Sequence, residues 1–357
     1  MKISGVNLDH PVALAPMAGM TDTAFRRLVK RRGGCGLVVT EMVSSEGLVR
    51  GIGRTLEYAE YTEEERPVSV QIFGGDPAVM ADAARIVETM GADIVDINMG
   101  CPVPKIAKHN AGCSLMREPD HAASVVRAMA RAVKIPVTVK MRAGWNANEI
   151  NAPTLARMAE DAGASALAVH GRTAAQSYSG ESDWSLVARV AAGVDIPVFG
   201  SGDCVDAEQV VSRLTDAGVA GVLVGRGALR NPWIFTQAAA ALRGARIPHV
   251  SLAERGRFLL EYIELLLTER VGEADGFRHS VPGTQPGAPP PTARGRERWV
   301  INKLRALGTW YTKGLDGGSR LRTAINSCES IQELRDLVAG HFLQDVAADS
   351  SAEVALV

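Results

Sequence analysis

Short apolar runs recur along most of the chain, and each is followed by a segment with helical periodicity. The runs are rich in β-branched residues and are bounded by glycine, proline or polar residues, which is typical of buried parallel strands. Residues 80–90 and 155–162 carry apolar positions at intervals of three and four, and Gly91 and Gly163 follow as helix stops. The eight runs are residues 12–19, 37–44, 68–75, 94–101, 137–144, 166–173, 198–203 and 221–228.

Eight successive strand–helix units predict an α/β protein with a (β/α)₈ fold, a TIM barrel. A doubly wound sheet is the structural alternative, but no nucleotide-binding glycine fingerprint stands at the first turn. Chemistry in such a barrel gathers where strands end and loops begin. Polar side chains follow almost every predicted strand, which a purely structural barrel would not require.

Beyond about residue 246 the pattern predicts a C-terminal helical bundle. Residues 251–270 predict one helix, and helical periodicity returns from Arg296 after a segment at 272–295 that is rich in proline and glycine. That segment predicts a flexible insertion, and the tail at 343–357 is expected to fray. We therefore expect a catalytic barrel at 1–245 and a helical domain at 246–342. The apolar stripes of its helices are Leu259, Ile263, Leu266 and Leu267, and then Val300, Leu304, Leu307 and Tyr311.

Composition limits the possible domain organisation and classes of function but does not identify a function. The 357 residues fit one barrel of about 250 residues plus an appendage. The net charge of −1 does not mark a nucleic-acid binder, so any basic surface must be local. Five scattered cysteines form no CxxC pair, which predicts no metal site. An odd cysteine count, no export signal and no bilayer-length apolar run indicate a cytoplasmic protein with reduced thiols and no membrane association.

The segment Asn98-Met99-Gly100-Cys101-Pro102 ends the fourth predicted strand. Gly100 and Pro102 predict a tight exit that holds Cys101 over the barrel mouth. An isolated cysteine is more often a buried turn residue. Its position at the catalytic end, beside Asn98, favours a reactive thiol here.

Lys140 and Arg142 alternate on the fifth predicted strand, so both point to the same face at the barrel mouth. Two cations there favour an anionic ligand, such as a charged ring or a phosphate. One alternative is a salt bridge to Glu41 or another acid at a strand end. A second is a Schiff-base lysine, as in some aldolases.

Glycine-rich loops end the seventh and eighth predicted strands, at Ser201, Gly202 and Asp203 and at Gly225 and Arg226. Barrels frequently hold a phosphate between these two loops through backbone N–H groups. The pair therefore favours a phosphorylated cofactor, with simple tight turns as the alternative.

Two other polar residues lie at strand ends. Gln71 can hydrogen-bond a planar heterocycle through both its donor and its acceptor. His170 is placed to contact a cofactor or substrate, although a lone histidine is more often structural.

The segment 294–322 is strongly basic, with a net charge of about +6 by its Lys, Arg, Asp and Glu content. Trp299, Trp310 and Tyr311 are interleaved with its cations, which favours a phosphate-binding surface on the helical domain. A solvated basic face is the alternative. The cations are Arg294, Arg296, Arg298, Lys303, Arg305, Lys313, Arg320 and Arg322.

Taken together, these motifs resemble the tRNA-dihydrouridine synthase family, and most closely its bacterial B-type branch. The similarity runs from about residue 12 to 327, outside the insertion, and the order and spacing of the motifs carry it. The motifs are Ala15-Pro16-Met17-Ala18-Gly19, Asp96-Ile97-Asn98-Met99-Gly100-Cys101-Pro102, Lys140-Met141-Arg142, His170-Gly171-Arg172-Thr173, Gly202-Asp203, Gly225-Arg226 and Trp310-Tyr311-Thr312-Lys313-Gly314-Leu315.

The resemblance implies FMN over the barrel mouth, with its phosphate on the loops 201–203 and 225–226. The family often has Asn where this chain has Ser201, so that single contact departs from the family pattern. By position, the ring would contact Pro16, Met17, Ala18, Gln71, Lys140 and His170, and the uracil would contact Asn98 and Arg142.

The resemblance further implies a flavin enzyme that reduces the 5,6 double bond of uridine in tRNA. NADPH, or alternatively NADH, would reduce FMN, which passes a hydride to carbon 6 while Cys101 protonates carbon 5. Lys303, Arg305 and Lys313 would grip the RNA backbone while the uridine is unstacked. We expect a monomer with no obligate protein partner.

Three other functions are compatible with parts of the sequence. They are a flavin barrel acting on a free pyrimidine, such as a dihydroorotate dehydrogenase, a Schiff-base aldolase using Lys140, and a non-catalytic RNA-binding protein. The position of the reduced uridine, the choice of nicotinamide nucleotide and the role of the insertion stay open.

Overall fold

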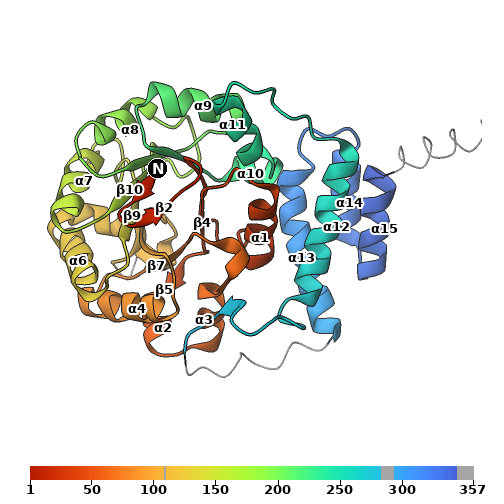
Figure 1. Ribbon diagram of the computed structural model, residues 1–357, viewed down its shortest axis with the longest axis horizontal. Helices are drawn as coiled ribbons and strands as arrows, with labels where there is room; N and C mark the ends of the chain where they lie inside the picture. Colours follow the sequence, from red (N-terminus) through yellow and green to blue (C-terminus); the bar gives the residue numbers. More distant parts are fainter. Residues whose placement is uncertain (108–109, 283–292, 344–357) are drawn as a thin grey trace, which may run out of the picture.

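The computed structural model describes residues 1–107, 110–282 and 293–343, and its centre is a closed barrel of eight parallel strands (Figure 1). Neighbouring strands pair in the order β4-β3-β12-β11-β10-β9-β8-β7, and a β4–β7 pairing closes the ring. Each strand begins at the first residue of its predicted run, so the predicted barrel is confirmed. The strands are β3 (Val12–Leu14), β4 (Leu37–Val39), β7 (Val68–Phe73), β8 (Ile94–Met99), β9 (Val137–Arg142), β10 (Ala166–His170), β11 (Val198–Ser201) and β12 (Gly221–Val224).

Helices cover the outside of the barrel, and local signals set where they begin and end. The Asp76 carboxylate caps α4 by accepting from Ala78 N at 2.8 Å, and Pro77 occupies the first turn. Gly91 follows the helix with a φ of 83°, a conformation that glycine adopts without strain. The covering helices are α1 (Thr23–Arg32), α2 (Ser45–Val49), α3 (Gly53–Ala59), α4 (Pro77–Thr89), α5 (Pro104–Ala107), α6 (Pro119–Ala132), α7 (Ala152–Asp161), α8 (Trp184–Ala191), α9 (Ala207–Asp216), α10 (Arg226–Arg230) and α11 (Ile234–Leu242).

The barrel interior changes from apolar to polar along its axis. At the amino-terminal end of the strands, an N-terminal hairpin of β1 (Lys2–Ile3) and β2 (Val6–Asn7) brings Ile3 against buried side chains of the strands. Residues at alternate positions point inward, so Asp96 and Asn98 of β8 share the interior face. The inward side chains become polar toward the carboxyl ends, where the candidate site lies. The apolar floor consists of Ile3, Leu8, Ala13, Ala15, Leu37, Ile94, Ala166, Phe199 and Leu223.

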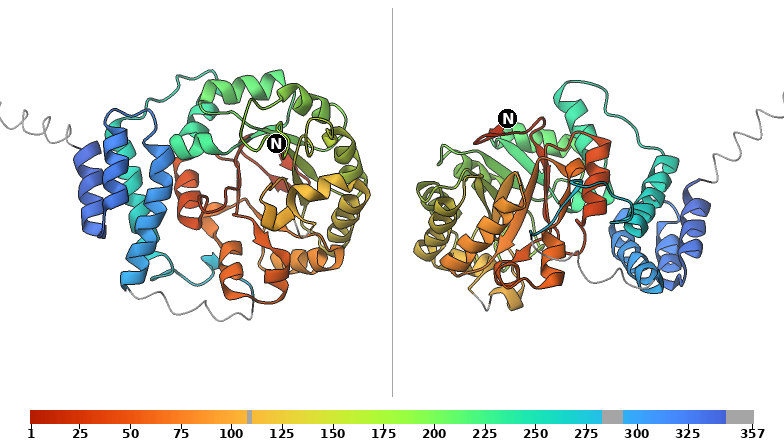
Figure 2. Two further views of the ribbon diagram at one scale, coloured as in Figure 1. Left: turned by 180° about the vertical axis from the view of Figure 1, so that it is seen from behind. Right: turned by 60° about the horizontal axis from the view of Figure 1, so that its bottom comes forward.

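Four further helices stand together beside α1 and α10, and we call α12 to α15 the helical region (Figures 1 and 2). Both predicted apolar stripes pack in its core, where Leu267 is only partly buried and Phe258 stacks on Tyr311 at 5.7 Å. Phe25 of α1 meets the edge of Phe258 at 6.1 Å, which joins the helical region to the barrel. The helices are α12 (Leu252–Thr268), α13 (Ala293–Tyr311), α14 (Gly318–Ser327) and α15 (Ile331–Phe342).

Part of the predicted insertion forms a strand. β13 (Arg278–His279) pairs antiparallel with β6 (Tyr61–Thr62), and the His279 ring stacks on Tyr61 at 4.7 Å. The Arg278 guanidinium also lies 3.6 Å from Glu60 Oε2, so these residues are tied to the barrel. Residues 283–292 of the insertion and 344–357 of the predicted tail lie outside the described residues, and their flexibility stays a prediction. No helix among the described residues is long and apolar enough to span a membrane.

Candidate active site

The thiol of Cys101 stands in a tight turn directly after β8. The Asn98 side chain shapes the turn, because its Oδ1 accepts from Gly100 N at 3.1 Å and from Cys101 N at 2.9 Å. Cys101 is a free cysteine at partial exposure, and its burial raises the pKa of the thiol. A thiol with a raised pKa stays protonated through neutral pH, so it can give up a proton.

A chain of hydrogen bonds behind the turn fixes the orientation of two amides. The buried Asp96 carboxylate accepts from Thr138 Oγ1 at 2.5 Å and from Gln71 Nε2 at 2.7 Å. Gln71 therefore turns its Oε1 toward Asn98 Nδ2, which donates to it at 2.8 Å. Because the amide groups of Gln71 and Asn98 are engaged inside the protein, their predicted contacts with flavin and uracil stay predictions.

Lys140 and Arg142 of β9 flank this turn, in register with Asn98 and His170 on the neighbouring strands. Among the described residues, neither cation forms an ion pair with a carboxylate, and Lys140 has no hydrogen-bond partner. Burial, and then the charge of Arg142, lowers the pKa of Lys140 to about 8. A buried guanidinium and a half-buried ammonium that form no ion pair with a carboxylate favour an anionic ligand.

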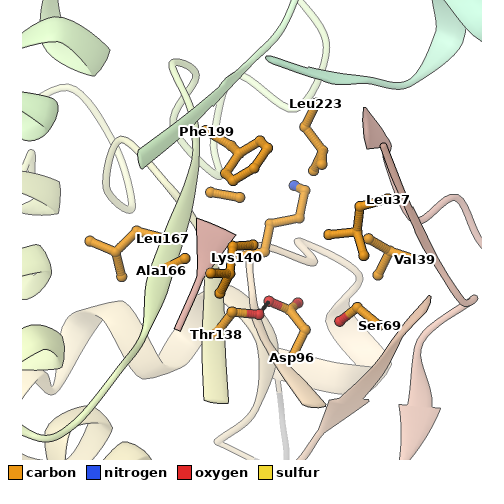
Figure 3. Close-up of a pocket in the computed structure, with 12 residues that line it drawn as sticks. Leu37, Val39, Ser69, Asp96, Thr138, Lys140, Ala166, Leu167, Phe199 and Leu223 are labelled. Carbon is orange, nitrogen blue, oxygen red and sulfur yellow. Dashed lines mark hydrogen bonds between the residues drawn. The ribbon is translucent and has the colours of Figure 1, made fainter. Parts of the chain in front are cut away.

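Lys140 also lines a small cavity in the barrel interior, of about 30 Å³ (Figure 3). Asp96 and Thr138 lie on its wall and are bonded to each other, and the Lys140 ammonium lies apart from them. The volume holds about one water molecule, so a larger ligand would have to lie above it, at the mouth.

Arg142 is held by backbone carbonyls of the loops around the mouth. Its Nε donates to Gly100 O at 2.8 Å, and its Nη1 donates to Thr173 O and Ser177 O, both at 2.9 Å. Within the described residues, its Nη2 has no hydrogen-bond partner. Tyr178 lies beside it with 58% of its surface exposed, and the guanidinium carbon is 5.8 Å from the ring centre. One donor face of Arg142 is therefore left for a ligand at the mouth.

A second ionic group lies at the ends of β10 and β11. Arg172 binds the Asp203 carboxylate through two contacts of 2.8 Å, and Asp203 also accepts from Ser182 N at 2.7 Å. Burial, and then the charge of Lys140, lowers the pKa of His170 to about 2, so its imidazole is neutral at physiological pH. The loop at 201–203 is therefore held in place by Arg172 and Ser182 of the segment after β10.

The loops after β3, β11 and β12 meet at the mouth. The Arg226 guanidinium lies 3.5 Å from Asp203, which joins the two loops predicted to hold a phosphate. A side chain at Gly225 would contact Met17 Sδ at 3.6 Å, and Ala18 is exposed beside it. The structure therefore brings the predicted cofactor residues of β3, β11 and β12 to one place, and their roles stay predictions. Pro16 belongs to the loop after β3, Ser201 ends β11 and Gly202 follows it.

The three cations predicted to grip RNA differ in their surroundings. Lys303 Nζ lies 3.0 Å from Asp22 Oδ2, on the barrel, and Arg305 Nη2 donates to Cys328 O at 2.8 Å. These side chains end on protein groups, so an RNA phosphate would have to displace existing contacts. Lys313 is exposed and is the cation of the three that is open to RNA.

Asp96, Thr138 and Tyr178 were not among the predicted site residues. Asp96 carried a usable signal, because a carboxylate two residues before Asn98 in an apolar strand shares its interior face. Tyr178 carried none, since it lies in a loop without periodicity. Its position follows only from the path of that loop over Arg142.

Comparisons with known proteins agree with this geometry. A sequence profile of the family described as Dihydrouridine synthase matches residues 13–285. A probable tRNA-dihydrouridine synthase of Rhodobacter capsulatus is 46% identical over 271 residues, 75% of this chain and 83% of that protein. One of Rickettsia conorii is 37% identical over 341 residues, 95% of each chain. The tRNA-dihydrouridine synthase B of Pseudomonas aeruginosa is 40% identical over 283 residues, 78% of this chain and 85% of that protein. The chain belongs to the dihydrouridine synthase family, in its bacterial B-type branch.

Proposed function

We propose that this protein is a tRNA-dihydrouridine synthase, a flavin-dependent oxidoreductase that reduces the 5,6 double bond of uridine in tRNA. The observation that carries the proposal is a pair of cations, the half-buried Lys140 and the buried Arg142, which form no ion pair with a carboxylate among the described residues and stand beside the Cys101 thiol. Membership of the family and the names of the relatives support the same reaction.

The residues at the mouth fit FMN. The Lys140 ammonium would face the polar edge of the ring, and Met17 and Ala18 supply an apolar wall beside it. Arg226 and the glycine-bearing loops after β11 and β12 would hold the phosphate. When bound, the flavin supplies the hydride that adds to carbon 6 of the uracil, and NADPH, or alternatively NADH, is the proposed source of the electrons.

Arg142 would hold the uracil ring. Its Nη2 donates to no group among the residues that the structure describes, so it can donate to a carbonyl oxygen on which negative charge develops. Tyr178 offers an exposed aromatic face beside it, of the kind on which unstacked bases pack. Arg142 is fixed by three backbone carbonyls, so it would be in place before the substrate arrives.

Cys101 would supply the proton that carbon 5 needs. Its S–H bond breaks as the new C–H bond forms, and the sulfur is left as a thiolate. Arg142, bonded to the carbonyl of the preceding residue Gly100, and Lys140 stabilise that thiolate until solvent returns the proton.

The helical region would bind the RNA backbone. Lys313 is exposed, and a side chain at Gly314 would approach Arg230 of the barrel, so cations of both parts lie close together there. We propose residues 1–245 as the catalytic domain and 246–342 as the RNA-binding domain of a cytoplasmic monomer.

The test is reconstitution of the FMN-loaded protein with tRNA from a strain lacking the gene. Cys101→Ala should bind FMN but form dihydrouridine about 10²–10⁴-fold more slowly. Cys113→Ala is the matched control, because that thiol is close by, is fully buried and has a pKa raised to about 11. Mass spectrometry of tRNA fragments measures the gain of two hydrogen atoms.

The outcomes separate the alternatives. Full activity of Cys101→Ala would remove the proton-donor role. Reduction of free pyrimidines but not tRNA would favour a dihydroorotate dehydrogenase-like enzyme, and borohydride trapping of substrate on Lys140 would favour an aldolase. RNA binding without flavin uptake or NADPH oxidation would favour a non-catalytic protein.

A further inference from the structure

Lys303 joins the helical region to the loop between β3 and α1. It extends from α13 with 14% of its side chain exposed, and its Nζ lies 3.0 Å from Asp22 Oδ2. The same nitrogen donates to Gly19 O at 3.1 Å and lies 3.8 Å from Glu41 Oε1. One ammonium therefore meets a backbone carbonyl and two carboxylates of the barrel.

These contacts hold the Gly19 peptide from both sides. Gly19 N donates to Glu41 Oε2 at 2.7 Å, while Lys303 binds the carbonyl of the same residue. Gly19 has a φ of 80°, which glycine adopts without strain, so the bonds at its N–H and its carbonyl decide how this peptide is oriented.

Asp22 fixes the other end of the loop. Its Oδ1 caps α1 by accepting from Phe25 N at 2.9 Å, and its Oδ2 accepts from Tyr262 Oη at 2.7 Å. Tyr262 belongs to α12, so two helices of the helical region, through Tyr262 and Lys303, converge on one carboxylate of the barrel.

The residues that face the mouth, Met17 and Ala18, directly precede Gly19 in the same loop. Met17 and Thr21 share three hydrogen bonds. Met17 N donates to Thr21 Oγ1 and Thr21 N donates to Met17 O, both at 3.0 Å, and Thr21 Oγ1 donates to Met17 O at 3.2 Å. Because this turn is short and internally bonded, a shift of Gly19 or Asp22 would move Met17 and Ala18 with it.

Removal of the Lys303 charge would disturb the loop by electrostatics. Asp22 and Glu41 are both largely buried, and each keeps Lys303 as an ion-pair partner. Without it the two carboxylates would repel each other in a medium of low dielectric constant, and Gly19 is bonded to one of them.

We propose that Lys303 is a positioning residue for the cofactor, through which the helical region completes the flavin site. The inference rests on the proposed function, because it takes the loop at 16–19 as one wall of the FMN site. It assigns Lys303 a role other than the predicted contact with RNA. By thermodynamic reciprocity, FMN binding should in turn strengthen the seating of the helical region on the barrel.

The test compares FMN affinity and stability in the full-length protein. Lys303→Met should weaken FMN binding about two- to thirtyfold and shift the absorption bands of the bound flavin. Lys303→Arg keeps the charge and should recover most of the affinity. Arg335→Met is the matched control, because it removes a cation from an exposed ion pair with Glu264 within the helical region.

A second variant guards against misfolding. Tyr262→Phe removes only the hydroxyl bond to Asp22 and should weaken FMN binding in the same direction, by less. Thermal unfolding of the FMN-free variants shows whether they are folded at the temperature of the titration.

Two outcomes overturn the inference, in distinguishable ways. A role in stability alone would lower the unfolding temperature of Lys303→Met, or of Tyr262→Phe if the first variant does not fold, while FMN affinity and flavin absorption stay as in the unmodified protein. If the unmodified protein itself takes up no FMN, the proposed function fails together with the inference.

Discussion

Buried and half-buried cations occur in two regions of this molecule, and only one of the regions provides them with carboxylates. Around α1, Arg26 bonds Glu65 at 2.5 Å and Lys303 bonds Asp22 at 3.0 Å, so each cation has a carboxylate. At the barrel mouth, Lys140 and Arg142 form no ion pair within the described part of the chain.

The paired cations serve the stability of the fold, whereas the cations without a carboxylate partner are suited to bind a ligand. In a buried ion pair the two charges compensate each other. Removal of one partner leaves the other charge uncompensated in a medium of low dielectric constant, which is destabilising. A buried cation without a partner already bears that desolvation, and an anionic ligand relieves it. The mouth is therefore the region where ligand affinity is gained at the expense of the stability of the empty protein.

The largest effect is expected from opening an ion pair of the first region. Glu65→Gln leaves the Arg26 guanidinium, only 2% exposed, without a counter-charge, and should lower the free energy of unfolding by about 3–5 kcal/mol. FMN affinity of the folded protein should not change. Urea denaturation measures the loss. The control is Arg85→Ala, in an exposed pair with Asp82, which should change the free energy of unfolding by less than about 0.5 kcal/mol. Equal losses in the two variants would contradict the proposed difference between buried and exposed ion pairs.

Removal of a cation from the second region should do the reverse. Lys140→Met should slow dihydrouridine formation about 10²–10³-fold and weaken FMN binding, because charge at the mouth is lost. Its free energy of unfolding should stay equal or rise, because the desolvation of the ammonium and its repulsion from Arg142 outweigh its attraction to Asp96. Lys134→Met, an exposed lysine just before the start of β9, should match the unmodified protein in both measurements. A lower free energy of unfolding in Lys140→Met would contradict this, because it would mean that Lys140 stabilises the fold.

The smallest effect concerns pH. Burial lowers the pKa of Lys140 to about 8, so the ammonium is present below that pH and is lost above it. FMN affinity should therefore fall by about tenfold between about pH 7 and about pH 9, as a linked protonation requires. Fluorescence titration measures this, and Lys140→Met should show a flatter profile. An unchanged slope in that variant would assign the pH dependence to another group.

The fold was largely readable from the sequence because its signals are local. Buried parallel strands need apolar, β-branched runs, and all eight barrel strands begin where such runs begin. The N-terminal hairpin and β13 were not predicted, since two-residue strands are too short to carry a period. β13 depends on a tertiary contact, because His279 pairs with and stacks on Tyr61, which is far away in the sequence.

The sequence by itself determined which side chains stand at the strand ends, because strand register and period two fix that. It did not determine their partners. Glu41 was an alternative ion-pair partner for Lys140 and Arg142, and only the tertiary structure directs it to Gly19 and Lys303 instead. Coulomb energy depends on the distance between side chains and on their burial, and both arise from packing between residues far apart in the chain. Because Glu41 pairs with Lys303 between the barrel and the helical region, it does not pair with Lys140 or Arg142. Both cations at the mouth can therefore bind an anionic ligand.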